Sequence, residues 1–175
     1  TFRFYDGAEK GALTDKWSVE LGSATYSTYS TQHPYGGRGR SIRIDTNSAA
    51  AEQIIRTSIS AATTDRQFWV RAMMYDDLDS SCHNTIRIYD GSSYVAIMGV
   101  WTGTSTSKYA IYTFPAGWVA STVNRSIGWH ELTFSWADST ITYYIDRVPV
   151  YSRTGGSSTP TWFKLDCGQP NIFSE

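Results

Sequence analysis

Apolar and polar residues alternate along most of the chain, most clearly between residues 128 and 150. The sequence HELTFSW places His, Leu, Phe and Trp at one parity and Glu, Thr and Ser at the other. After the turn sequence ADST, residues 141–146 continue the alternation. Side chains of a strand point alternately to opposite faces, so a period of two predicts paired strands. Asp138 and Ser139 favour a tight reversal because their side chains bond nearby backbone. We therefore predict a long β-hairpin with aromatic residues on both faces.

Further strands are predicted wherever the same alternation recurs between turn sequences. They cover residues 1–6, 40–45, 67–76, 84–90, 93–101, 108–114 and 161–167, with one more from about residue 53 onward. Asp90 and Gly91 lie between two alternating runs, a pattern typical of a β-hairpin. The sequence shows no repeat of fixed period and no clear amphipathic helix. Many short strands with regular turns predict an all-β sandwich or barrel.

Length and charge narrow the classes of protein. A chain of 175 residues with 41% hydrophobic content favours one domain, residues 1–175, with a full core. The formal net charge is −1, with acids and bases mixed, which argues against nucleic acid as a partner. No apolar run approaches the roughly 20 residues that span a bilayer. The polar start TFRFYDGAEKG does not fit a signal peptide, so we expect a mature or excised piece of a larger protein.

Aromatic residues make up 15% of the chain, with 7 Trp and 12 Tyr. With abundant Ser and Thr, this composition is typical of secreted β-proteins that bind sugars, and equally of β-sandwiches in general. Cys82 and Cys167 lie far apart and outside any CxxC sequence, which argues against a zinc site. A disulfide between them and simple packing as small apolar residues both stay open.

The hairpin resembles that of concanavalin A-like jelly rolls, including laminin-G-like domains. In that pattern W-H-x-(apolar)-x-(apolar) precedes a polar turn and a strand that ends Y-(apolar)-D-x-(apolar). The residues at those places are Trp129, His130, Leu132, Phe134, Tyr144, Ile145, Asp146 and Val148. FYDGAEKGALTDKW and GGRGRSIRI resemble the opening segments of bacterial members. The resemblance covers essentially the whole chain and implies an antiparallel β-sandwich (jelly roll) of two sheets. This fold carries lectins, carbohydrate-binding modules, glycanases, lyases and adhesion domains.

The sequence matches neither of the catalytic motifs that enzymes of this fold carry. Glycanases of this fold carry E-x-D-x-x-E on one strand, because hydrolysis needs paired carboxylates. Residues 75–81 are acidic but turn-like, and Glu131 has no acid two or four residues further on, so the hydrolase motif is absent. The R-x-E-x-R motif of lyases is not matched either. Arg71 and Arg87 are nevertheless able to neutralise a uronate, with His83 or a tyrosine as base, so lyase activity remains an alternative.

A sugar-binding surface needs exposed aromatic planes beside polar side chains that bond hydroxyl groups. One parity of residues 67–76 is apolar throughout, whereas the other interleaves aromatic and basic residues, and residues 84–90 repeat this arrangement. Two further aromatic residues lie on strands whose outward face the pattern leaves open. The alternative for each ring is packing beneath a loop. The predicted ligand-binding residues are Trp69, Arg71, Arg87, Tyr89, Trp101 and Tyr112.

The resemblance also implies a cofactor. Bacterial modules of this fold often hold a structural calcium ion through N-terminal acids, and calcium prefers hard oxygen ligands. Asp6 and Glu9 stand at the matching positions, and Asp166 is expected to approach them because first and last strands usually neighbour each other. Solvated turn acids are the alternative.

These observations predict a non-catalytic polysaccharide-binding domain of a larger secreted or cell-surface protein. One alternative is a polysaccharide lyase or glycoside hydrolase of the same fold. The other is a structural or adhesion jelly roll, as in cell-surface or phage proteins, without a sugar site.

Overall fold

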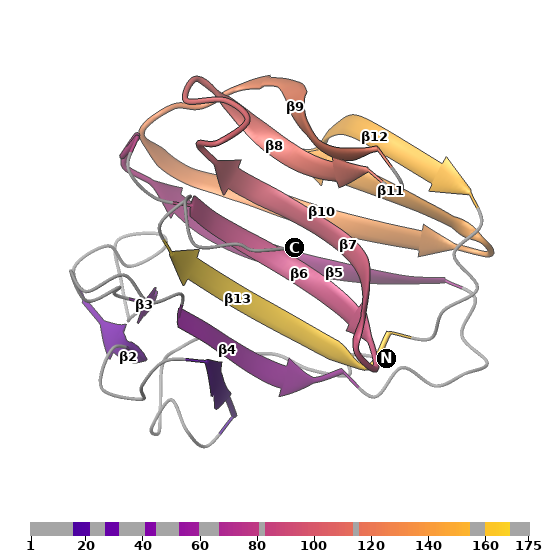
Figure 1. The fold of residues 1–175 in the computed structure, drawn as a ribbon, viewed down its shortest axis with the longest axis horizontal. Coiled ribbons are helices and arrows are strands. Elements are labelled where there is room, and N and C mark those ends of the chain that lie inside the picture. The colour runs from indigo at the N-terminus through magenta and orange to yellow at the C-terminus, as the bar shows by residue number, and fades with distance from the viewer. Residues whose placement is uncertain are drawn as a thin grey trace.

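The computed structural model describes residues 16–21, 27–31, 41–44, 53–59, 67–80, 83–113, 116–154 and 160–168. These segments form strands, turns and bends, without a helix among them. Two antiparallel sheets lie one behind the other (Figure 1), so the predicted all-β sandwich of two sheets is confirmed. In the described part of the chain, no helix is long and apolar enough to cross a membrane.

The larger sheet has seven strands in the spatial order β1-β4-β13-β6-β7-β8-β9. Their bounds are β1 Ser18–Leu21, β4 Gln53–Ser58, β13 Trp162–Gly168, β6 His83–Asp90, β7 Ser93–Trp101, β8 Lys108–Thr113 and β9 Gly117–Asn124. The second sheet has four strands in the order β12-β11-β10-β5. Their bounds are β12 Val148–Thr154, β11 Thr140–Ile145, β10 Gly128–Ala137 and β5 Gln67–Asp76. A two-stranded sheet pairs β2, Ser27–Ser30, with β3, Ser41–Ile44.

Strand boundaries follow the alternation closely where it is strong. The predicted ranges of β5 and β7 match the structure at both ends, and β6, β8 and β13 agree within one residue. The sequence pattern missed β9 and β12, along with the short β1. β12 contains Pro149 and lies at a sheet edge, where a residue without an N–H is tolerated. The predicted strand at residues 1–6 lies outside the described residues.

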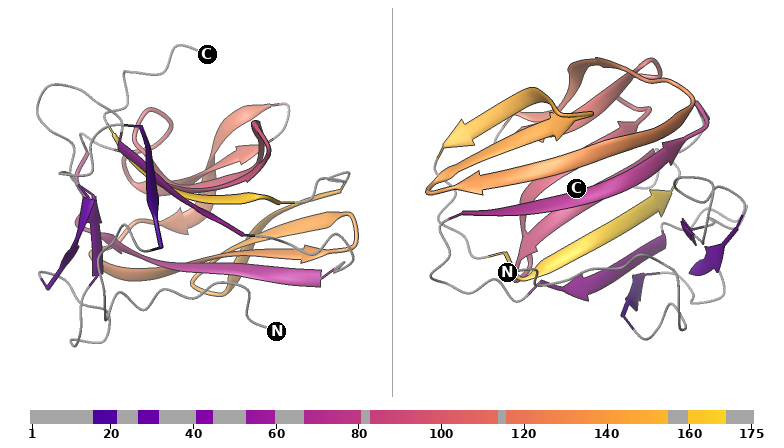
Figure 2. Two further views of the ribbon diagram at one scale, coloured as in Figure 1. Left: turned by 90° about the horizontal axis from the view of Figure 1, so that it is seen from below. Right: turned by 180° about the vertical axis from the view of Figure 1, so that it is seen from behind.

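The core lies between the two sheets. Ile86 and Ile88 of β6 face Leu132 and Phe134 of β10 within one cluster of buried apolar residues. Figure 2 shows the sheets stacked in the left panel, with the four-stranded sheet nearest the viewer in the right panel. Burying each such side chain contributes roughly 1.5–3 kcal/mol, so this layer is the main source of stability. The alternation that buries these residues turns the intervening ones to the two outer faces.

Residues of the family-like hairpin have structural roles. Asp146 and Arg147 take positive φ angles of 50° and 67° in the two-residue turn between β11 and β12. Such turns match the twist of paired strands. The Asp146 carboxylate accepts a hydrogen bond from the Glu131 N–H at 2.8 Å and lies 2.6 Å from His130 Nδ1. The histidine and aspartate of the motif therefore fix the turn to the start of β10.

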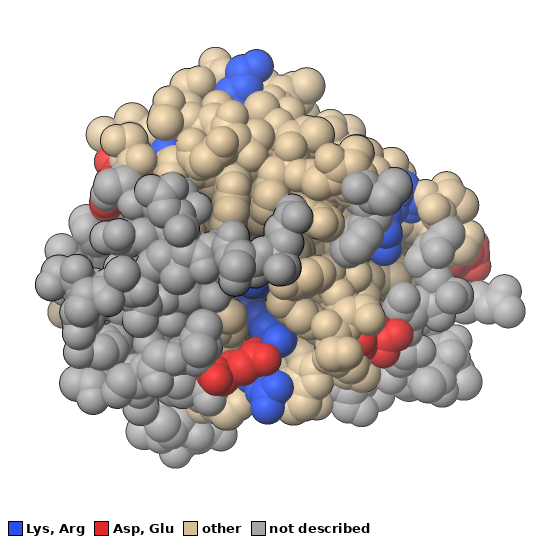
Figure 3. Space-filling model, in the orientation of Figure 1, with Lys and Arg blue, Asp and Glu red and all other residues tan. Residues whose placement is uncertain are grey.

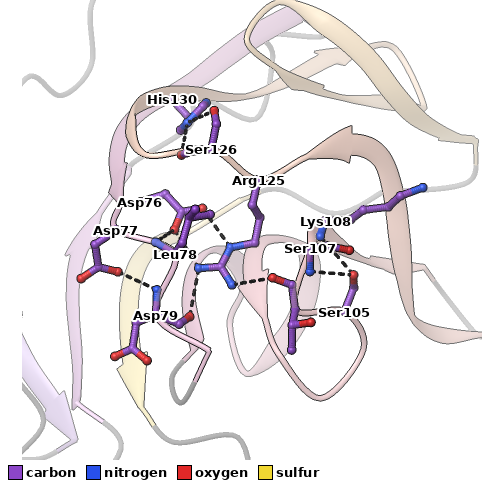
Figure 4. Close-up of polar contacts among 11 residues, drawn as sticks. Asp76, Asp77, Leu78, Asp79, Ser105, Ser107, Lys108, Arg125, Ser126 and His130 are labelled. Atoms are coloured by element: carbon purple, nitrogen blue, oxygen red, sulfur yellow. Dashed lines mark hydrogen bonds and ion pairs between the residues drawn. The ribbon is translucent and has the colours of Figure 1, made fainter.

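A buried ion pair joins the two sheets at one end of the sandwich (Figure 4). Arg125, which follows β9, donates from Nε and Nη2 to the carboxylate of Asp76 at the end of β5, at 2.9 and 2.7 Å. The same guanidinium donates to the carbonyls of Thr106 and Asp79. The Leu78 N–H also donates to Asp76, at 2.8 Å. One arginine thus holds three loops together.

Candidate functional site

The outer face of the seven-stranded sheet, called here the front face, is turned toward the viewer of Figure 1. Because Ile86 and Ile88 point into the core, their neighbours Thr85, Arg87 and Tyr89 point to the front face. Strand pairing extends this assignment: Arg87 lies opposite Ile97 of β7 and Lys164 of β13. Figure 3 shows that the described atoms of this face are mostly uncharged, with basic and acidic atoms meeting low on it.

Two tryptophans stack on each other across this face. The rings of Trp101 on β7 and Trp118 on β9 lie 4.5 Å apart with an interplanar angle of 7°. Strand β8 runs between them, and there Ala110 pairs with Gly99 on one side and Ala120 on the other. We infer that this row of small residues leaves the space in which the two indoles meet.

A chain of ring contacts continues from the tryptophan pair. Trp118 contacts Tyr112 edge-on at 5.5 Å, and Tyr112 lies 6.2 Å from Tyr94. The ring of Tyr94 lies 4.9 Å from that of Tyr89, and the two residues pair across β7 and β6. The row of rings is open to solvent at Tyr94, which is 44% exposed. Trp101, Tyr112 and Trp118 are partly exposed. The rings together form an aromatic surface with polar edges.

A buried polar cluster lies beside the aromatic surface. The Arg87 guanidinium forms an ion pair with the Asp166 carboxylate of β13. Thr85 Oγ1 donates to the same carboxylate oxygen at 2.9 Å and accepts from Arg87 Nε at 3.0 Å. His83 Nε2 lies 3.3 Å from that oxygen, and the His83 ring lies 4.7 Å from that of Trp101. These polar groups are held in fixed positions next to the rings.

A second set of charges borders the face toward β1. Lys164 Nζ donates to the Glu20 carboxylate at 2.7 Å and lies 3.6 Å from the centroid of the Tyr89 ring, a cation–π contact. Arg56 lies 3.6 Å from the same carboxylate, and its guanidinium lies 4.2 Å from the ring of Trp162. The carboxylates of Glu20 and Asp166 on this face therefore each have at least one cationic partner.

The tyrosine nearest these charges is unsuited to act as a base. Burial raises the pKa of Tyr89 far above its usual value, despite the opposing charge of Arg87. The phenol therefore stays neutral at ordinary pH and serves as a hydrogen-bonding group.

The structure divides the predicted ligand-binding residues between two faces. Arg87, Tyr89, Trp101 and Tyr112 meet on the front face, as described. The other two, Trp69 and Arg71, lie on β5 in the four-stranded sheet and point away from the core on the opposite side of the sandwich. Arg71 lies 3.5 Å from Glu131. The expected single surface of Trp69, Arg71, Arg87 and Tyr89 is therefore two surfaces.

Some front-face residues were missed by sequence reasoning. Trp118 follows the turn sequence FPAG and begins a strand with mixed polar residues, so no alternation marked it. Tyr94 was ambiguous because a bulge between Ile88 and Tyr89 shifts the register of β7. Lys164 was identifiable in principle, because it shares the parity of Asp166 in the sequence TWFKLDC.

The predicted calcium ligands are only partly described. Asp166 is surrounded by Arg87, Thr85 and His83, and a carboxylate already held by a guanidinium is a poor ligand for a further cation. Asp6 and Glu9 lie outside the described residues, as does Cys82, so the calcium site and the disulfide stay predictions. No group of three or more His, Cys, Asp or Glu side chains in the described segments has the arrangement to hold a metal.

Comparisons with known proteins support the jelly-roll fold. A scan of protein-family models and a search of curated proteins gave no match. Among solved structures, an apo Crh5 transglycosylase superposes with a TM-score of 0.64 at 16% identity, covering 94% of this chain and 68% of that chain. A Bacillus licheniformis β-glucanase gives a TM-score of 0.57 at 12% identity, covering 93% of this chain and 83% of that one.

A chain described as a sialidase gives a TM-score of 0.67 at 14% identity. This match covers 97% of the present chain but only 15% of the sialidase chain. At such identities the likeness concerns the fold alone. It agrees with the jelly-roll fold that the hairpin residues predict.

Proposed function

We propose that the protein binds polysaccharide on its front face and does not cleave it. The observation that carries this proposal is the continuous chain of ring contacts from Tyr89 through Tyr94, Tyr112 and Trp118 to Trp101. Aromatic planes stack on the C–H faces of sugar rings, and the phenol and indole groups at their edges bond sugar hydroxyls. The buried polar cluster beside them holds this surface in shape.

The charges of the front face favour binding over hydrolysis. Glycoside hydrolysis requires a pair of carboxyl groups set across the scissile bond, one of them protonated. In the described part of the front face, Asp166 is held by Arg87 and Glu20 by Lys164. Each of these two carboxylates is thus already engaged by a cationic side chain. The fold shared with a β-glucanase and a transglycosylase makes an enzyme the second candidate.

We further propose an extracellular setting, in which the domain belongs to a larger chain and calcium bound near Asp6 and Glu9 stabilises it. The abundance of Trp, Tyr, Ser and Thr is compatible with the extracellular setting and is shared by β-sandwiches in general. The match to 15% of a sialidase chain supports the larger chain, since a jelly roll of this size occurs there within a longer protein.

Affinity electrophoresis in soluble β-glucans, xylan and acidic polysaccharides tests the proposal with matched variants. Tyr94→Ala and Trp118→Ala are expected to weaken binding, each by roughly tenfold or more. Val119→Ala is the control, because Val119 neighbours Trp118 but pairs with the core residue Ile111. New reducing or unsaturated ends in the same mixtures would make the protein an enzyme instead. Wild-type binding by both aromatic variants would refute the front face as the site.

A further inference from the structure

The outer face of the four-stranded sheet, called here the back face, exposes a large aromatic ring. Trp69 is 66% exposed, although it lies within a regular strand. Its ring lies 6.0 Å from that of Tyr144 on β11, with an interplanar angle of 34°. An exposed tryptophan paired with a second ring on a flat sheet is typical of an interaction surface rather than of packing.

The strand between the two rings supplies small hydroxyl residues. β10 lies between β5 and β11, and there Ser135 pairs with Trp69 while Thr133 pairs with Tyr144. The rings therefore meet across a strip of short polar side chains. Ser135 and Thr133 are themselves buried, so the two rings and their neighbours cover this strip.

Two arginines near the rings are much more exposed than the carboxylate that they share. Arg71 pairs with Thr133 across the strands, and its Nε lies 3.5 Å from Glu131 Oε1. Arg147 Nε lies 3.7 Å from the other oxygen of the same carboxylate. The arginine side chains are 62% and 81% exposed, whereas that of Glu131 is 13% exposed. One largely covered carboxylate on the back face therefore lies near two guanidinium groups that face solvent.

We propose that the back face is a second polysaccharide-binding site and that its ligand is an acidic chain of uronate residues. The C–H face of one sugar stacks on Trp69 and Tyr144. A sugar carboxylate pairs with the guanidinium of Arg71, whose planar fork suits a carboxylate, and Arg147 meets a further one along the chain. Charge complementarity selects this ligand over a neutral glucan. The two sites lie on opposite sides of the sandwich, so one domain is able to cross-link two chains.

Binding to polygalacturonate, compared with its carboxyl-reduced neutral form, tests this proposal by isothermal titration calorimetry. Trp69→Ala and Arg71→Gln are each expected to weaken polygalacturonate binding roughly tenfold. Lys16→Gln, an exposed residue before β1, controls for the change in net charge. Raising the salt concentration is expected to weaken wild-type binding more than that of Arg71→Gln.

The outcomes separate this site from the front face. In a protein that already carries Tyr94→Ala or Trp118→Ala, Trp69→Ala is expected to cause the same loss of polygalacturonate binding as in the wild type. This holds whatever the front-face variants do to binding at the front face. Equal affinity for the carboxyl-reduced chain would overturn the acidic ligand. Unchanged binding by Trp69→Ala and Arg71→Gln would overturn the site itself. Concentration-dependent dimerisation of the wild type that Trp69→Ala abolishes would assign the back face to a second copy of the chain.

Discussion

Arg87 on β6 and Asp166 on β13 form a buried ion pair on the outer face of a sheet, 79 residues apart in the sequence. Thr85 and His83 complete the contacts of the carboxylate. Outer faces of antiparallel sandwiches are usually exposed to solvent. A buried ion pair on such a face therefore indicates that the side chains around it are packed in a defined arrangement. The pair links β6 to β13 near the charged residues, such as Lys164, that border the aromatic rings.

Removing one partner of this pair is expected to be costly. Arg87→Ala leaves a carboxylate buried without its cation and should lower the free energy of unfolding by about 3–5 kcal/mol. The double variant Arg87→Met/Asp166→Leu removes both charges and should be markedly more stable than the single variant. Urea unfolding followed by tryptophan fluorescence measures both. A single variant that loses less than about 1 kcal/mol would show that the pair is solvated.

Gly99 on β7 allows a separate prediction about the close approach of the β6 and β7 backbones. A Cβ atom at this position would lie 2.2 Å from the carbonyl oxygen of Asn84, and the φ angle is +149°. Gly99→Ala therefore requires the backbone of β6 and β7 to move apart, and we expect a loss of at least about 2 kcal/mol. Gly91→Ala is the matched control, because Gly91 also has a positive φ but open space around it. Its loss should be about 1 kcal/mol, from backbone strain alone. Equal losses in thermal unfolding would contradict the close approach.

The alternation that predicts the strands also predicts which side chains point away from the core. Residues 67–76 were predicted as one strand with Val70 inward and Trp69 outward, and the structure agrees. A period of two is a local property of the chain, and it survives in any sheet. Sheet membership is not local. β5 pairs with β10, more than 50 residues further on, so nothing in its own sequence separates Trp69 from Tyr89.

The residue types of the candidate site were predictable from the sequence, but the way in which the residues group in space was not. Arg87, Tyr89, Trp101 and Tyr112 were expected from their residue types, and they do share a face. The stacking of Trp118 on Trp101 depends on the order of β7, β8 and β9 and on the small residue Ala110 between them. Such contacts arise from strand pairing, which residue spacing along the chain does not encode.

The turn at Asp146 predicts losses of stability of different size for two substitutions. Asp146→Asn keeps a side chain that tolerates positive φ and an oxygen for the Glu131 N–H, so the loss should stay below about 1 kcal/mol. Asp146→Ala loses the contact with His130 and strains the turn, and should cost about 2–3 kcal/mol. Chemical unfolding of both variants measures the difference. Equal stability of the two would mean that the His130 contact and the turn contribute little.

Acid should weaken the brace between Asp76 and Arg125. Burial alone would raise the pKa of Asp76, but the hydrogen bonds and charge of Arg125, with the Leu78 N–H, outweigh it and leave the pKa below its usual value. A carboxyl whose pKa is lowered by folding stabilises the native state above its unfolded pKa of about 3.9, and this stability is lost as pH falls through the folded pKa. The difference in unfolding free energy between wild type and Asp76→Asn should therefore be constant from pH 7 to about pH 5 and shrink below pH 4. Urea unfolding across this range measures it, with Asp138→Asn in an exposed turn as the control. A difference that stays constant below pH 4 would show that Asp76 does not depend on its charge to hold Arg125.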